Sequence, residues 1–160
     1  MLDHVGQSAQ LHSLRPALSN ADAAYAALLD HADPGEHTRV LLIGSDTLEL
    51  MCALIRRGCV SVATLRPLDR PERASADLVI IPHAAATKCA DAVLAHARWA
   101  LVPLGSLVLR LPGSPPSLIG QQLGRSLRLH GFSSIRTTVH AGDVLLRAEL
   151  PLFGRLECAA

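Results

Sequence analysis

Short apolar runs alternate with amphipathic stretches along most of this sequence, and this alternation constrains the fold more than any other feature. Four runs of five or six residues, too short for buried helices, are rich in leucine and β-branched side chains, as parallel strands buried on both faces are. They are residues 39–43, 60–65, 77–81 and 106–111. Helical spacing appears between them at 47–57 and 86–100, and the first of these helices carries one apolar stripe of Leu48, Met51, Cys52 and Ile55. Because right-handed crossovers place helices on both faces of a sheet, the pattern predicts an α/β fold, a three-layer sandwich with a mostly parallel sheet.

The N-terminal residues predict helices that precede the first strand. Apolar side chains recur at helical spacing in residues 11–18 and again in 20–31. We therefore expect an N-terminal helical segment, 1–36, packed on the core of an α/β domain that spans 37–160.

The C-terminal residues predict a hairpin. Two strand-like runs, 135–140 and 144–150, are joined by a short connection that contains Gly142. A turn at Pro103 to Gly105 is expected to precede the fourth strand. The sheet should then hold about six strands and end in an antiparallel hairpin.

Composition excludes several classes of protein. With 160 residues, 49% of them hydrophobic and only 18% charged, the chain is expected to fold as one compact unit rather than stay disordered. Aromatic residues make up 2%, too few for a platform that stacks single-stranded nucleic acid, and the net charge of +1 gives no bulk attraction to DNA or to an anionic membrane. We therefore expect no nucleic-acid or membrane partner, while the aliphatic composition favours a homodimer.

The N-terminal residues indicate the cellular compartment, and the cysteines and histidines show no spacing typical of a metal site. Residues 1–10 hold no apolar run of signal-peptide length, so we expect a cytoplasmic protein. No CxxC pair occurs among the four cysteines, which are predicted to be unpaired. Since the histidines show neither HxH nor HxxxH spacing, no metal site is predicted.

Several strand ends together resemble the class I S-adenosylmethionine-dependent methyltransferases. The first strand leads into Gly44, and the third leads into Pro82 and His83. Residues 101–107 read Leu-Val-Pro-Leu-Gly-Ser-Leu, and a helix, Gly131, Phe132 and a hairpin close the chain. The resemblance covers residues 38–152 and implies a Rossmann-like sheet in which S-adenosylmethionine would be the cofactor.

The resemblance implies that the turn after the first strand would carry this cofactor, on Gly44, Ser45 and Asp46. Gly44 stands at the family's first glycine position, but Asp46 and Leu48 stand at the two later ones and add side chains where the ligand would approach. A purely structural interpretation is also open, in which Gly44 turns the chain and Asp46 or Thr47 caps the following helix.

The end of the second strand departs from the family in a second way. An acidic residue that accepts hydrogen bonds from the ribose hydroxyls is usual there, whereas this chain has Arg66, which has five donors and no acceptor. Asp69 can take that role only if the loop folds back. The link from Arg66 to Ala76 is also too short for the strand and helices that the family places there. These residues predict weak S-adenosylmethionine binding or none.

Two further groups carry chemistry. His83 follows a parallel strand at the edge where such sheets collect ligands, so it is a candidate general base; the alternative is a polar residue at a helix start. Arg66, Arg70 and Arg73 form a candidate site for a small anion or an acidic partner; the alternative is pairing with Asp69 and Glu72 on a solvated surface.

The replaced residues favour a degenerate methyltransferase-like domain that acts as a non-catalytic binding, scaffold or regulatory module. Its expected ligand is a protein partner or a small anion. Two alternatives stay open at this point: an active S-adenosylmethionine-dependent methyltransferase, and a nucleotide- or anion-binding domain that uses the arginine loop.

Overall fold

The computed structural model describes residues 20–84, 90–113 and 116–152, which form four helices and six strands. In chain order the elements are α1 (Asn20–Ala32), β1 (Arg39–Ile43), α2 (Leu48–Arg56), β2 (Ser61–Leu65), β3 (Ala76–Ile81), α3 (Ala90–Ala100), β4 (Leu101–Leu111), α4 (Pro116–Leu129), β5 (Ser133–His140) and β6 (Asp143–Glu149). The helix predicted at 11–18 lies outside the described residues.

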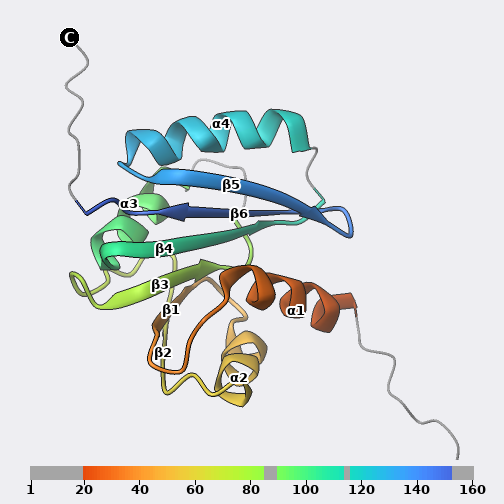
Figure 1. Ribbon diagram of the computed structural model, residues 1–160, viewed down its shortest axis with the longest axis vertical. Helices are drawn as coiled ribbons and strands as arrows, with labels where there is room; N and C mark the ends of the chain where they lie inside the picture. The colour runs from red at the N-terminus through yellow and green to blue at the C-terminus, as the bar shows by residue number, and fades with distance from the viewer. Residues whose placement is uncertain (1–19, 85–89, 114–115, 153–160) are drawn as a thin grey trace, which may run out of the picture.

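One sheet runs through the molecule in the order β2-β1-β3-β4-β6-β5 (Figure 1). The strands β2, β1, β3 and β4 pair in parallel, and β6 pairs antiparallel with both β4 and β5. Ala141 and Gly142 turn the β5–β6 hairpin with φ of 49° and 85°, the left-handed values that a tight two-residue hairpin turn requires. The predicted six-strand, mostly parallel sheet with a terminal hairpin is confirmed.

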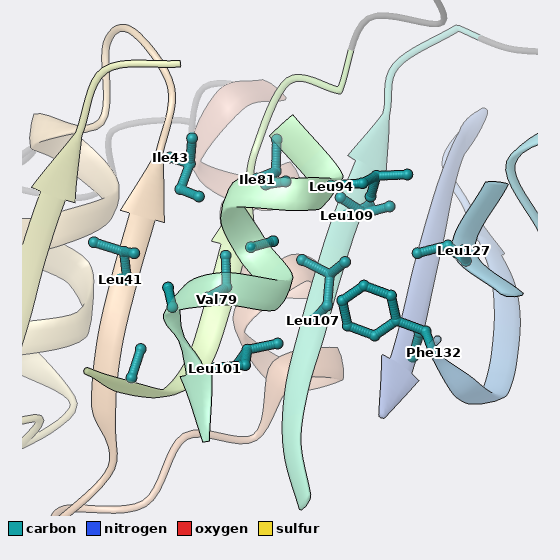
Figure 2. Packing of buried hydrophobic residues seen from close by; sticks show 14 of the residues in the cluster. Leu41, Ile43, Val79, Ile81, Leu94, Leu101, Leu107, Leu109, Leu127 and Phe132 are labelled. Atoms are coloured by element: carbon teal, nitrogen blue, oxygen red, sulfur yellow. The ribbon is translucent and has the colours of Figure 1, made fainter. Parts of the chain in front are cut away.

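Helices cover both faces of this sheet because its central strands, such as β1 and β3, are apolar on both faces. Side chains of a strand alternate between faces, so Leu41 and Ile43 of β1 join α3 and α4 in one core cluster (Figure 2), while Val40 and Leu42 join α1 and α2 in the other. Tyr25 and its neighbours on α1 are part of this second cluster. The three layers follow from this alternation.

Helix α2 packs through a different face from the one its apolar stripe indicates. The buried residues are Leu50 and Leu54, whereas Leu48 and Ile55 are 65% and 55% exposed. Because this helix is short and mostly apolar, it has two overlapping apolar faces. The position of β1 and β3 decides which of the two faces is buried.

The turn expected at Pro103 to Gly105 is part of a strand. Strand β4 begins at Leu101, and its pairing with β3 shifts register at this point. The backbone N–H of Leu104 donates to the Leu150 carbonyl at 2.8 Å, and the N–H of Leu150 donates to Gly105 at 2.9 Å. Proline and a residue with φ of 65° are tolerated there because the strand is bulged, so the sheet continues through the turn-like sequence.

Between β2 and β3, residues 66–75 hold turns only. The expectation that this link carries no additional strand or helix is confirmed. In consequence β2 is an edge strand, and most of its residues are exposed.

Arg147 of β6 holds the C-terminal end of α1. Its guanidinium donates to the backbone carbonyls of His31 and Ala32 at 3.2 and 3.4 Å, where a helix leaves carbonyls without intrahelical partners. The Nε2 atom of the His31 ring is buried without a hydrogen-bond partner. Burial first, and then the charge of Arg147, lower the pKa of His31 below 6.5.

The His31 environment predicts a pH-dependent stability. Because its pKa is lower in the folded than in the unfolded chain, the folded chain binds fewer protons, and stability should fall as the pH drops below about 6.5. Chemical denaturation between pH 7.5 and pH 5 measures this loss. In His31→Gln, the dependence of the free energy of unfolding on pH should become weaker. In the matched control His37→Gln, at an exposed position, this dependence should be unchanged. An unchanged slope in His31→Gln would contradict the assignment.

Candidate functional site

The carboxyl ends of β1, β2 and β3 meet at one edge of the sheet and bring three predicted site residues together. The backbone N–H of Gly44, just after β1, donates to the carbonyl of Leu65 at the end of β2, at 3.0 Å. A Cβ atom on Gly44 would lie 3.8 Å from ring carbons of Pro82, which follows β3. Gly44, Arg66 and His83 therefore belong to one contiguous edge, where open α/β sheets collect ligands.

In the turn after β1, Asp46 adopts a backbone conformation that is typical of glycine, but it carries a side chain. Asp46 has a φ of 57°, in the left-handed region, and aspartate is among the few residues besides glycine that adopt it. Ser45 and Asp46 are exposed at this turn. Thr47 stands at the N-cap of α2 without a side-chain capping hydrogen bond, so the capping interpretation is wrong for Thr47. The turn presents a carboxylate at the sheet edge.

The chain folds back immediately after β2. The backbone N–H of Asp69 donates to the carbonyl of Arg66 at 3.0 Å, which closes a tight turn. Both side chains are exposed. This turn meets the condition under which Asp69 could supply a carboxylate near the end of β2, although Arg66 itself occupies the strand end.

His83 has a partner that sequence reasoning missed. Its Nε2 lies 3.5 Å from the Tyr25 hydroxyl, and the two rings meet edge to face with centroids 6.5 Å apart. Tyr25 is 9% exposed and comes from α1, whereas His83 is exposed. A phenol held beside an imidazole orients the ring and can exchange a proton with it. Because the two residues are 58 positions apart in the sequence, no local pattern could have indicated the pair.

The three predicted anion-binding arginines do not form one cluster. Arg66 lies at the carboxyl end of β2, but Arg70 and Arg73 lie over the ring of Trp99, with guanidinium carbons 5.1 and 5.2 Å from its centroid. Trp99 is at the end of α3, next to the first residues of β4, at the amino end of the sheet. The expectation that all three arginines project at the carboxyl edge is wrong, because the link must cross from the end of one parallel strand to the start of the next.

The pairing alternative for these arginines also fails. Within the described part of the chain, none of the three guanidinium groups forms an ion pair with Asp69 or Glu72. The carbonyl of Glu72 instead accepts a hydrogen bond from the Ser75 hydroxyl at 3.0 Å.

Two further groups of predicted residues can be placed. Cys52 is exposed and Cys59 is buried, both with free thiols, and burial raises the pKa of the Cys59 thiol. The other two cysteines, Cys89 and Cys158, lie outside the described residues. Among residues 20–84, 90–113 and 116–152, no three side chains of His, Cys, Asp or Glu gather as metal ligands, and no helix there is long and apolar enough to cross a bilayer.

No protein-family model matches this chain, and no curated protein matches it in sequence. Solved structures do match. A putative methyltransferase of Haloferax volcanii, determined in complex with the activator Trm112, has a TM-score of 0.63 at 12% identity, over 80% of this chain and 88% of that one. Phosphoethanolamine N-methyltransferase 2 of Haemonchus contortus, in complex with S-adenosylhomocysteine, has a TM-score of 0.64 at 11% identity, over 81% of this chain and 52% of that one.

Other matches extend this group. The 16S rRNA N2 G1207 methyltransferase of T. thermophilus, in complex with S-adenosylmethionine and guanosine, gives 0.62 at 16% identity, over 84% of this chain and 40% of that one. The [4+2]-cyclase SpnF has a TM-score of 0.61 at 13% identity, over 83% of this chain and 82% of that one. At such low sequence identities, the matches show a similar fold and not a shared activity. With a six-strand sheet in the order β2-β1-β3-β4-β6-β5 and helices on both faces, this chain has a shortened fold that is like that of the class I S-adenosylmethionine-dependent methyltransferases.

Proposed function

We propose that this chain is a methyltransferase-like domain that does not transfer methyl groups and acts as a binding or regulatory module. The observation that carries the proposal is Arg66 at the end of β2, beside Gly44. A ribose diol is bound by a group that accepts hydrogen bonds from both hydroxyls, and a guanidinium can only donate. The position that would hold the cofactor's ribose therefore presents donors where acceptors are needed.

The turn after β1 supports the same proposal. Asp46 is exposed in a left-handed conformation, so its carboxylate occupies space that a glycine would leave open to the cofactor. Both departures act on the same ligand.

The proposal predicts that S-adenosylmethionine does not bind at micromolar concentration. Calorimetric titration of the full chain with S-adenosylmethionine and with S-adenosylhomocysteine measures this directly. A ligand at one hundred times its dissociation constant stabilises a fold by about 2.7 kcal/mol, which is about 5 to 10 °C in Tm for a chain of this size. We expect no such shift. A shift of this size with micromolar ligand would overturn the proposal.

A double variant provides the matched control. Arg66→Asp restores an acceptor at the end of β2, and Asp46→Gly removes the side chain from the turn at a φ that glycine adopts freely. If the two residues are what excludes the cofactor, this variant should bind S-adenosylhomocysteine more tightly than the unmodified chain. Equal affinities would show that these two residues do not exclude it.

An active methyltransferase is the second candidate function, and two observations favour it. The tight turn after β2 returns Asp69 toward the strand end, and the Tyr25–His83 pair places a proton acceptor at the same edge. In that function Asp69 would hold the ribose, the cofactor would supply the methyl group, and His83 would accept the proton of the methylated group. Tight S-adenosylmethionine binding that Asp69→Asn abolishes would support this candidate.

A further inference from the structure

Two arginines and the only tryptophan of the chain gather at the amino end of the sheet, away from the candidate site. The guanidinium carbons of Arg70 and Arg73 lie 5.1 and 5.2 Å from the centroid of the Trp99 ring. The ring is 41% exposed, and both arginines are exposed, so this cluster is open to solvent. Since both guanidinium carbons lie within 5.2 Å of one ring centroid, they are no more than about 10 Å from each other.

The backbone of the loop that carries the two arginines is attached to the fold at two points. The N–H of Ala74 donates to the carbonyl of Trp99 at 3.0 Å, which joins the loop to the end of α3. Pro71, between the two arginines, is buried. Stacking on the indole further restricts two long side chains that would otherwise lose rotamer freedom on binding a ligand. The two guanidinium groups are therefore preorganised.

Neither arginine is ion-paired within the part of the chain that the structure describes. Asp77, the first acidic residue after the loop, accepts two hydrogen bonds at 3.0 Å from the Arg39 side chain, and these lower the pKa of Asp77. Arg98, next to Trp99, donates to the backbone carbonyl of His130 at 2.8 Å. Two positive charges thus remain together at the surface.

We propose that Arg70, Arg73 and Trp99 form a binding site for a phosphate-bearing small molecule. Guanidinium groups form paired hydrogen bonds with phosphate oxygens, and two of them match a group of charge near −2 better than a single carboxylate of charge −1. The site lies at the opposite end of the sheet from Gly44 and His83, so this inference is independent of the function proposed for that edge.

Trp99 makes the proposal directly measurable. Because the chain has one tryptophan, tryptophan fluorescence, excited selectively over that of Tyr25, reports on this cluster alone. The full chain is titrated at constant ionic strength with pyrophosphate, inorganic phosphate and acetate. We expect a saturable change in emission with pyrophosphate, a weaker one with inorganic phosphate, and none with acetate.

Variants in the same loop provide the controls. In Arg70→Gln/Arg73→Gln, pyrophosphate affinity measured by calorimetry should fall at least about tenfold, because each charged hydrogen bond lost is worth more than that factor. The matched control Arg66→Gln removes an exposed arginine of the same loop that does not stack on Trp99, and it should bind as the unmodified chain does. The milder Arg73→Lys keeps the charge and loses the planar fork, so its affinity should also fall.

Three results would overturn the proposal. The first is a change in emission that does not saturate. The second is an equal response to acetate, which would indicate a general effect of carboxylate or salt. The third is a fall in affinity in Arg66→Gln as large as in the double variant, which would indicate loop charge rather than this cluster. If the double variant does not fold, the comparison of Arg73→Lys with Arg66→Gln decides the outcome.

Discussion

Replacing Asp143 by alanine should lower the free energy of unfolding by about 3 kcal/mol, because it leaves a largely buried guanidinium without its partner. The Arg110 Nη2 and Nε atoms lie 2.7 and 2.8 Å from one Asp143 oxygen, and the two side chains are only 12% and 17% exposed. The other Asp143 oxygen accepts from the N–H of Gly113 at 3.3 Å. This pair joins β4 to the start of β6, so its loss also weakens the hairpin that closes the sheet.

A second ion pair in the same sheet is the matched control. Arg39 and Asp77 also join neighbouring strands, at 3.0 Å, but their side chains are 46% and 37% exposed. Water replaces the lost contacts there, so Asp77→Ala should cost about 1 kcal/mol or less. Urea denaturation midpoints, with unchanged m values, measure both losses. Equal losses would show that burial does not set the cost of breaking these pairs.

Replacing Leu42 by alanine should lower the free energy of unfolding by about 3 kcal/mol. Leu42, in β1, is 0% exposed and belongs to the core cluster that joins the sheet to α1 and α2. Truncation removes its transfer free energy and leaves a cavity that close-packed neighbours fill only in part.

An exposed leucine provides the comparison for this core position. Leu48, 65% exposed at the start of α2, should tolerate alanine within about 0.5 kcal/mol. Denaturation of the two variants side by side measures the difference. A large loss in Leu48→Ala would mean that the apolar stripe of α2 is covered in the folded protein, against the packing described here.

The fold leaves the chemistry open, and the neighbours in structure illustrate why. They include methyltransferases that act on very different molecules and a [4+2]-cyclase, all similar in fold to this chain with TM-scores of 0.61 to 0.64. Activity depends on a few side chains at strand ends, which the sheet positions but does not specify. For this reason Arg66 and Asp46 carry more weight in the proposed function than the likeness of the whole chain.

Local sequence determined most of the elements of this protein. Strand β1 has the bounds that its sequence predicts, because five apolar-rich residues between a polar loop and Gly44 have no other regular structure to adopt. The absence of a strand or helix in residues 66–75 is equally a matter of chain length, which no tertiary contact can alter. The positions of Gly44, Arg66 and His83 at one edge follow from parallel connectivity, which the alternation of strands and helices already requires.

Tertiary structure alone decided which side chains meet across the fold. The buried face of α2, the extension of β4 through Pro103, the Tyr25–His83 pair and the stacking of Arg70 and Arg73 on Trp99 all depend on elements distant in sequence. Periodicity records only which side chains share a face of their own helix or strand. Which neighbour covers that face is set by the packing of the whole core, and that is why the predicted arginine cluster divided between the two ends of the sheet.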